Sequence, residues 1–469
     1  MNPHGEIPVR TEQDVVLARQ AVRQAAVACG LRLVDQTKLV TAASELARNA
    51  VVYGGGGTMS WHVVRDGMRA GIRLEFVDQG PGITDIAQAL TDGWTSGTGM
   101  GLGLSGSRRL VDAFEIDSAP RARHAGGDHQ MGVGFIGQAT RVIPVEEATR
   151  VGQVRREARA LAACAGFGEL DAGRVTLAAT EVATNVLRHG GGGRMLLSLV
   201  QGRTGPGVEV CAIDRGPGFS LERCLPDGYT TGVGSPGQGL GAIRRQAQVF
   251  DVWSDAGGAV VLARIYPERS RDEDLDYGAL RVPLGRETVC GDAWFLGRDG
   301  ARVVVALVDG LGHGVQAGEA AAAGIEAVAE APELAPDLQL GRMHARMAGS
   351  RGGAVAVACH EPEAGLVRFS GVGNIAASVH EAGLPARGLP SHPGIVGGQY
   401  RRAPGFSLPV APGALLLLHS DGLQSRWNLA RYEGLAFRHP ALVLAVLLRD
   451  FDRGRDDTGA IAVRLGGRA

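Results

Sequence analysis

The feature that most constrains this chain is an internal repeat. Six segments near its amino-terminal end return later in the same order, five of them at one identical offset and a glycine cluster at an offset longer by two. An almost constant offset over so many segments predicts one fold built twice in tandem. The recurring pairs are Ile7–Val9 and Ile143–Val145, Glu45–Asn49 and Glu181–Asn185, Gly54–Gly57 and Gly190–Gly193, Asp78–Gly82 and Asp214–Gly218, Phe114–Ile116 and Phe250–Val252, and Gly99–Gly103 and Gly237–Gly241.

Each copy has the same predicted order of elements. The pattern predicts a helix over Thr11–Cys29 in the first copy and over Glu146–Ala165 in the second. A second helix in each copy ends at a run of glycines, which is a stop signal. Two strands, a glycine-rich loop and a further helix follow. The predicted strands are Trp61–Val64, Ile72–Val77, Met195–Val200 and Val208–Ile213.

The repeat does not reach the end of the chain. A charged run at Glu268–Asp276 predicts a solvated linker, and beyond it the pattern changes to short strands with alanine-rich helices. We therefore expect an α/β chain of α+β sandwiches with three domains. Their predicted limits are 1–140 and 141–267 for the two copies, 268–279 for the linker, and 280–469 for a different domain.

Composition excludes several classes of protein. The 48 basic and 49 acidic residues give a net charge of −1, so a nucleic-acid partner is not expected. Lys38 is the only lysine, and its context fits neither a P-loop nor a protein-kinase motif. The six cysteines lack zinc-site or disulfide spacing, and the longest apolar runs fall far short of the ~20 residues that span a bilayer. We expect a cytoplasmic protein with reduced cysteines and no membrane partner.

The repeated motifs have the chemistry of a nucleotide site. Glu45 and Asn49 share one helix face, where a carboxylate beside an amide oxygen suits a Mg²⁺–phosphate group. Asp78 follows a predicted strand, and the glycines after it let the backbone approach a flat base. Each later glycine cluster opens a helix, whose free N–H groups bind phosphate. The candidates are Glu45, Asn49, Asp78, Gly80, Gly82, Gly99, Gly101 and Gly103 in the first copy, and Glu181, Asn185, Asp214, Gly216, Gly218, Gly237, Gly239 and Gly241 in the second.

In this order the motifs resemble the N, G1 and G2 boxes of the GHKL, or Bergerat-fold, ATPases. The first copy, through SELARNAVVYGGGG, DQGPGI and GLGLSGSRRLVDAFEI, resembles the RsbT-type switch kinases. The second, through TEVATNVLRHGGGG, DRGPGF and GQGLGAIRRQAQVFDVWS, resembles the broader RsbW/RsbT group of anti-sigma-factor kinases. The first copy departs from the pattern after Phe114–Ile116, because it runs on without a clear turn before its closing strand.

The resemblance implies a role for each box and implies ATP with Mg²⁺ as cofactors. The N-box glutamates would act as general bases toward a protein hydroxyl, and the N-box asparagines would bind Mg²⁺. The G1 aspartates would read adenine, and the G2 glycines would form a phosphate lid. These assignments fall on Glu45 and Glu181, on Asn49 and Asn185, on Asp78 and Asp214, and on Gly99–Gly103 and Gly237–Gly241.

Carboxylates also stand out in the carboxyl-terminal domain. Asp292 lies in CGDAW, Asp309 and Asp421 follow apolar runs, and Asp456 and Asp457 lie in RGRDDTGAIAV. Strand-end carboxylates that converge on one edge of a sheet would form an oxygen-rich site for two hard divalent ions. Two such ions ~3.5–4 Å apart can activate a water for attack on a phosphate. Mn²⁺ and Mg²⁺ both suit such a site, and zinc is disfavoured.

Residues 285–466 resemble the SpoIIE/PP2C phosphatases, most closely the RsbX type, through GDAW, ALVDGLGHGVQAGEAA, GVGNIAA, GIVG, LHSDGL and HPALVLAVLLRDFDRGRDDTGAIAV. The resemblance implies an αββα sandwich in which Asp309 bridges two metal ions with help from the Gly310 carbonyl. Asp292, Asp421 and Asp456 would complete the ligands.

Three further residues lie in or beside these motifs. Asp457 is an additional candidate ligand. His313 in GLGHG is either a group that handles protons near the site or a loop histidine without a role, and Asn374 in GVGNI is expected as a turn residue near the site.

Together the two resemblances imply a partner-switching or stressosome regulator of a sigma factor. In it, serine/threonine kinase modules and a metal-dependent phosphatase would act on STAS-domain proteins of the RsbS, RsbR or RsbV kind. Two alternatives stay open. In one, both ATP-binding copies only regulate the phosphatase. In the other, they sequester a sigma factor or its regulator.

Overall fold

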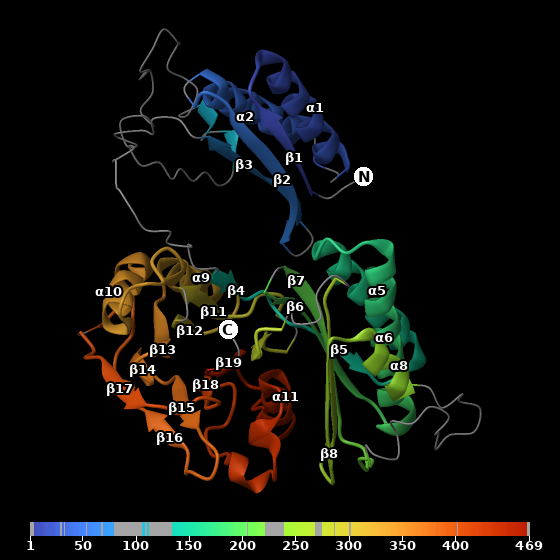
Figure 1. Ribbon diagram of the computed structural model, residues 1–469, viewed down its shortest axis with the longest axis vertical. Helices are drawn as coiled ribbons and strands as arrows, with labels where there is room; N and C mark the ends of the chain where they lie inside the picture. The colour runs from blue at the N-terminus through green and yellow to red at the C-terminus, as the bar shows by residue number, and fades with distance from the viewer. Residues whose placement is uncertain are drawn as a thin grey trace. The chain divides into compact units, whose positions relative to one another are not determined.

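The chain folds into two compact units, Met1–Asp128 and His129–Ala469 (Figure 1). Each unit is treated by itself below. The computed structural model describes residues 4–28, 31, 33–52, 54–66, 69–78, 106–107, 110–111, 134–203, 205–220, 239–267, 274–285, 287–299, 302–400 and 402–466.

In the described part of the first unit, two long helices pack on an antiparallel sheet of order β1-β2-β3. Small and branched side chains from both helices meet the strands in one apolar core that includes Val15, Ala43 and Met59. The elements are β1 (His4–Val9), α1 (Glu12–Ala28), α2 (Leu33–Val52), β2 (Gly57–Asp66) and β3 (Arg69–Asp78).

The second copy repeats this arrangement of two helices on a sheet, and its strands have the order β5-β6-β7-β9-β8. The predicted helices and strands are confirmed, and the strands extend beyond their predicted ends. The elements are β5 (Arg141–Val145), α5 (Ala148–Cys164), α6 (Glu169–His189), β6 (Gly193–Gln201), β7 (Pro206–Asp214), α8 (Gly239–Gln246), β8 (Val249–Asp255) and β9 (Gly258–Ile265).

The repeat extends to the strand register. Ile7 pairs with Met59 across β1 and β2, and Ile143 pairs with Met195 across β5 and β6. Both members of the pair shift along the chain by the offset of the repeated motifs. Because a slip of one residue would move every side chain to the other face of the sheet, equal registers place equivalent side chains in equivalent surroundings.

The glycine run after the second helix also has one conformation in both copies. Gly55 and Gly56 have φ angles of 69° and 99°, and Gly191 and Gly192 have φ angles of 68° and 104°. Residues with a side chain rarely adopt these left-handed values, so glycine is needed to end the helix and enter the next strand.

The carboxyl-terminal domain is a sandwich of two antiparallel sheets, as predicted. One sheet has the order β17-β14-β13-β12-β11-β4 and is covered by α9 and α10, and the other has the order β10-β19-β18-β15-β16 and is covered by α11. The elements are β4 (Gly134–Ile136), β10 (Tyr277–Val282), β11 (Asp292–Asp299), β12 (Arg302–Gly310), α9 (Val315–Ala329), α10 (Pro336–Met347), β13 (Gly353–Glu361), β14 (Leu366–Val372), β15 (Ala376–His380), β16 (Arg387–Leu389), β17 (Phe406–Pro409), β18 (Leu415–His419), η1 (Leu429–Arg431), η2 (Leu435–Phe437), α11 (Pro440–Phe451) and β19 (Thr458–Arg464).

Two segments join this sandwich from ranges that the sequence placed elsewhere. Strand β4 pairs with β11 at the sheet edge, although 134–136 lies in the range predicted for the first domain. Thr140 continues the contact, because its N–H donates to the carbonyl of Arg281 and its Oγ1 accepts from the N–H of Arg281. Strand β10 begins at Tyr277, inside the range predicted as linker. The segment after Phe114–Ile116, which departs from the family pattern, therefore includes an edge strand of the sandwich.

Helix α11 lies between the sandwich and the sheet of the second copy (Figure 1). Its residues from Pro440 to Arg449 are all buried. A helix that is apolar on all sides needs a partner on all sides. One face packs on β10 and β19, and the other packs on β7 and β9, so a single apolar core joins the two domains.

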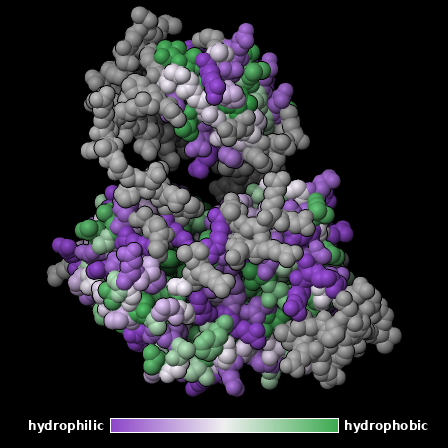
Figure 2. All heavy atoms as spheres, viewed as in Figure 1, coloured by the Kyte–Doolittle hydropathy of each residue, from purple (hydrophilic) through white to green (hydrophobic). Residues whose placement is uncertain are grey.

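Among the helices that the structure describes, none has the length and apolar character needed to cross a bilayer. Figure 2 shows hydrophilic and apolar side chains interspersed on the visible face of the second unit.

Candidate metal centre and nucleotide sites

Strand pairing brings the predicted carboxylates to one edge of the sandwich. Asp292 begins β11 and lies directly opposite Asp309 near the end of β12. Asp421 follows β18, and Asp456 and Asp457 precede β19 in the facing sheet. We call these five aspartates the carboxylate edge.

The two sheets come very close at this edge. A Cβ atom on Gly459 in β19 would stand only 2.8 Å from Oδ2 of Asp292. Glycine at this position therefore lets the aspartates of both sheets converge.

Burial and mutual repulsion govern the protonation of the carboxylate edge. Burial raises the pKa of Asp309 well above its ordinary value, and the charges of the other four aspartates raise it further. Burial also raises the pKa of Asp292 and outweighs a hydrogen bond from Ser420, while the charges of Asp457 and Asp456 add to the rise. Acidic groups forced together in this way favour bound cations, because a cation removes the repulsion.

Three side chains hold the edge in place. Ser420 Oγ donates a hydrogen bond to Asp292 Oδ2 over 2.7 Å, and Asn374 Nδ2 donates one to Asp421 Oδ2 over 2.8 Å. Asp457 is buried, and its carboxylate accepts hydrogen bonds from the backbone N–H groups of Leu284 at 2.7 Å and Gly291 at 2.6 Å. Asp457 thus fixes the loop that precedes Asp292 rather than pointing freely into the site.

The glycine loop that follows Asp309 (Gly310–Gly314) is also packed closely. A Cβ on Gly310 would collide with the carbonyl oxygen of Ala317, so only glycine fits there. His313 is exposed, and its Nδ1 lies 3.3 Å from Oε1 of Glu287. Burial raises the pKa of Asp456 and outweighs the charge of His313, which lowers it, so the histidine lies near the edge.

The donor set of the carboxylate edge fits hard divalent ions, since it consists of carboxylate oxygens. Among the described residues, a group with three ligand atoms within 4.8 Å of one another occurs elsewhere, at Asp274, Asp276 and His439. That group is an ion-pair cluster, because Asp274 already binds Arg264 and His439.

The nucleotide motifs of the second copy meet at the end of α6. Glu181 and Asn185 are half-buried and four residues apart on this helix, as predicted. Asp214 ends β7, and its Oδ1 accepts hydrogen bonds from the backbone N–H groups of Gly216 at 2.9 Å and Ala259 at 3.2 Å. A Cβ on Gly190 would stand 2.6 Å from Cβ of Asp214, so the helix end lies against the aspartate.

The first copy has the same contact between helix end and aspartate. A Cβ on Gly54 would stand 2.5 Å from Cβ of Asp78. On α2, Asn49 lies one turn after Glu45, whose carboxylate is 3.3 Å from the guanidinium of Arg48.

The glycines of the predicted phosphate-binding loops are only partly described. Gly239 begins α8 and Gly241 is buried within it. Gly218 has a φ of 70°, a value that requires glycine beside the carbonyl oxygen of Asp255. The predicted positions Gly80, Gly82, Gly99, Gly101, Gly103 and Gly237 lie outside the described residues.

The second nucleotide motif also contacts the sandwich, through residues that the motifs did not indicate. Arg215, which follows Asp214, donates a hydrogen bond to the backbone carbonyl of Arg449 in α11. The buried Arg449 donates to the carbonyl of Gly258 at 3.0 Å and to Asp255 at 2.9 Å. An arginine in the otherwise apolar run PALVLAVLLRDF was the available sequence signal.

The amino-terminal end of α11 is held in a similar way. His439 caps the helix by accepting a hydrogen bond from Ala441, and its backbone N–H donates to Asp251 of β8 at 3.0 Å. Its Nε2 lies 2.9 Å from Oδ2 of Asp274. Burial opposes the ionised form of Asp274, but Arg264 and His439 hold the pKa of this carboxyl below its ordinary value. Both ends of α11 are therefore bound to the second copy and its linker.

Comparison with known proteins defines the class of each domain. Residues 144–265 match the histidine kinase-like ATPase domain family, and residues 34–134 match the histidine kinase-, DNA gyrase B- and HSP90-like ATPase family. Residues 299–465 match the stage II sporulation protein E (SpoIIE) family. This range includes Asp309, Gly310, Asp421 and Asp456, and Asp292 precedes it.

One relative is the serine/threonine-protein kinase RsbT of Bacillus subtilis, which is 42% identical over 118 residues, or 25% of this chain and 89% of RsbT. The chain belongs to the RsbT family of ATPases. It joins two histidine kinase-like ATPase domains, one of them RsbT-like, to a phosphatase domain of the SpoIIE/PP2C type.

Similar solved structures include RsbX in complex with magnesium, with 19% identity, coverage of 39% of this chain and 92% of that one, and a TM-score of 0.36. Another is the PP2C phosphatase domain with a fragment of the regulatory domain of SpoIIE from Bacillus subtilis. It has 15% identity, coverage of 55% of this chain and 79% of that one, and a TM-score of 0.34.

Asp457→Ala should lower the affinity for Mn²⁺ about 10–100-fold, because the two backbone N–H groups before Asp292 lose their acceptor and the ligand loses its support. Isothermal titration calorimetry of the full chain measures this. The matched control is Asp337→Ala, since Asp337 on α10 pairs with the exposed Arg402. Equal Mn²⁺ affinity in both variants would show that Asp457 does not support the site.

Proposed function

We propose that the carboxyl-terminal domain is a Mn²⁺- or Mg²⁺-dependent phosphoserine/phosphothreonine phosphatase in a cytoplasmic partner-switching regulator. The observation that carries this proposal is the carboxylate edge, where strand pairing gathers aspartates from two sheets. The proposed substrates are STAS-domain proteins of the RsbS, RsbR or RsbV kind that control a sigma factor. Support for these substrates comes from the likeness to RsbT and the motif resemblance to RsbX.

In this proposal Asp309, the Gly310 carbonyl, Asp292, Asp421 and Asp456 would hold two metal ions. Bound ions would neutralise the carboxylates and activate a water for in-line attack on the phosphoryl group. Ser420 and Asn374 orient Asp292 and Asp421 toward the ions. Asp457 holds the backbone in front of Asp292, so its charge is satisfied by N–H donors instead of a metal.

Asp309→Asn should reduce Mn²⁺-dependent hydrolysis of para-nitrophenyl phosphate by about 100-fold or more, because the bridging carboxylate is lost. Initial rates of the purified full chain measure this, with Asp337→Asn as a matched surface control. Circular dichroism checks that both variants are folded. Equal metal-dependent turnover in wild type and Asp309→Asn would contradict the phosphatase proposal.

We also propose that the first ATPase copy phosphorylates the STAS partner, with Glu45 as general base and Asn49 as Mg²⁺ ligand. Phosphoryl transfer depends mainly on positioning and charge neutralisation, so this short set of residues is sufficient. The support is the relation to the kinase RsbT and the shared geometry of the two copies.

Glu45→Ala should lower phosphate transfer from ATP to a purified RsbS-like STAS protein by about 100-fold or more, since a positioned base contributes ~10²–10⁴-fold. Glu181→Ala should retain most of the transfer. Labelled ATP measures both, with Glu75→Ala on the exposed face of β3 as a control. Loss of transfer in Glu181→Ala with full activity in Glu45→Ala would reverse the assignment.

A second function is favoured for the second ATPase copy, namely that it regulates the phosphatase by binding nucleotide. Its G1 motif contacts α11 directly through Arg215. The end of α11 is in turn bonded to the segment that follows Asp421. The N–H of Gln424 donates to the carbonyl of Phe451, and the N–H of Arg453, which lies between α11 and Asp456, donates to the carbonyl of Gly422. A nucleotide that moves the G1 motif would therefore act on the segments next to Asp421 and Asp456.

Saturating ATP or ADP should change the Mn²⁺-dependent rate of the full chain by about fivefold or more, within the ~1–3 kcal/mol typical of coupled sites. Arg215→Ala should reduce this response below about twofold while nucleotide still binds. The surface variant Arg150→Ala on α5 is the matched control. A wild-type rate that ignores nucleotide, or a full response in Arg215→Ala, would rule out this route.

A further inference from the structure

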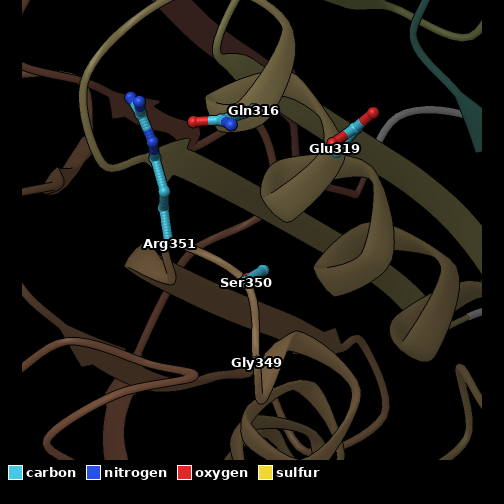
Figure 3. Close-up of a pocket in the computed structure, with 5 residues that line it drawn as sticks. All are labelled: Gln316, Glu319, Gly349, Ser350 and Arg351. Carbon is cyan, nitrogen blue, oxygen red and sulfur yellow. The ribbon is translucent and has the colours of Figure 1, made fainter.

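A pocket of about 360 Å³ lies beside the carboxylate edge and is outside the roles described above. It is formed by the first turns of α9 and by the turn between α10 and β13 (Figure 3). The pocket is close to the edge because Gly353, which starts β13, pairs with Gly310. Its lining residues are Gln316, Glu319, Gly349, Ser350 and Arg351.

The backbone around Arg351 is fixed on both sides. Gly349 and Gly352 have φ angles of 84° and 70°, values that favour glycine. Ser350 Oγ donates to the carbonyl of Met347 at 2.6 Å and accepts from the N–H of Gly352 at 3.1 Å. Leu311 in the glycine loop donates to the carbonyl of Gly352 at 2.9 Å. This turn therefore has a fixed conformation and is bonded to the glycine loop beside the carboxylate edge.

The side chain of Arg351 is exposed and, among the residues that the structure describes, makes no hydrogen bond or ion pair. Its Nη1 would stand 3.0 Å from a Cβ on Gly312, so the guanidinium lies against the glycine loop. On α10, by contrast, Arg342 and Arg346 both pair with Glu330. Arg351 thus presents a positive charge, without a partner in the described chain, next to the phosphatase centre.

A guanidinium is a planar fork that binds a carboxylate or phosphate through two parallel hydrogen bonds. In Figure 3 the amide of Gln316 lies on the same side of the pocket as the guanidinium of Arg351, and the carboxylate of Glu319 points away from it. Within the described chain, the five aspartates of the carboxylate edge do not line this pocket. The pocket is therefore placed to hold a group that flanks the phosphoryl group rather than the phosphoryl group itself.

We propose that Arg351 binds an acidic side chain of the phosphoprotein substrate, close in sequence to the phosphoserine or phosphothreonine. Arg351 would then determine which phosphorylated segments the phosphatase accepts, while the metal-binding aspartates act on the phosphoryl group. This inference rests on the proposed phosphatase function. It adds that the substrate must carry an acidic residue near the phosphoserine or phosphothreonine.

The test compares phosphoserine peptides that carry either Asp or Asn at each of three positions on either side of the phosphoserine, together with para-nitrophenyl phosphate. For the preferred Asp peptide, Arg351→Gln should raise KM about tenfold and leave kcat within about twofold, since one charge-assisted contact made in both ground and transition states is lost. KM for the Asn peptides and for para-nitrophenyl phosphate should not change. Arg346→Gln, an exposed arginine on α10, is the matched control.

A charge reversal gives a second test. Arg351→Glu should prefer a peptide with Lys in place of the preferred Asp, which a structural role alone would not produce. The proposal fails if Arg351→Gln leaves KM for every peptide unchanged. It also fails if KM rises equally for para-nitrophenyl phosphate, because Arg351 would then bind the phosphoryl group. Metal-dependent hydrolysis of para-nitrophenyl phosphate by the wild type shows separately whether the phosphatase function holds.

Discussion

Burial of α11 on all of its sides is the constraint on which the second unit depends. It packs on β10 and β19 of the sandwich on one side and on the sheet of the second ATPase copy on the other. Each buried leucine contributes about 1.5–3 kcal/mol relative to exposure. Separating the two domains would expose one face of this helix and one face of the ATPase sheet, so the apolar contact itself holds the nucleotide motif against the phosphatase.

The polar contacts at the ends of α11 set the orientation of that interface. The buried Arg449 donates hydrogen bonds to the half-buried carboxylates of Asp255 and Asp450 and to the carbonyl of Gly258. Burial lowers its pKa, but these hydrogen bonds outweigh burial and keep the pKa above the ordinary value. Removal of one partner from a buried ion pair costs about 3–5 kcal/mol, because the other charge stays buried. The interface therefore tolerates little rotation of α11. The segment that bears Asp456 begins where this helix ends, and the segment after Asp421 is hydrogen-bonded to it.

Much of this organisation was predictable from sequence because it depends on local patterns. The constant offset of the repeat predicted equal domains, and the structure gives them equal strand registers at Ile7 and Ile143. The aspartates were identifiable because each lies in a short motif at a strand end. The roles of Asp457 and Ser420 were harder to predict. Asp457 accepts hydrogen bonds from backbone N–H groups and Ser420 donates one to Asp292, and such contacts produce no spacing pattern in the sequence.

The contacts between domains could not be predicted in the same way. Strand β4 is short and joins a sheet whose other strands lie far along the chain, so no periodic pattern identified its partner. Arg215 and Arg449 likewise come together from distant positions in the sequence. Such pairs depend on how finished domains pack. The arginine within an apolar run indicates that Arg449 needs a buried partner, but it does not say which residue that partner is.

Hydrogen exchange of the full chain in increasing urea tests most directly whether the second ATPase copy and the phosphatase share one core. Residues that unfold together lose protection together. The account predicts that the amides of β9, α11 and β18 lose protection at the same urea concentration. Loss of protection in β9 at a clearly lower urea concentration, with α11 and β18 still protected, would show that the two domains are stable independently and would contradict the account.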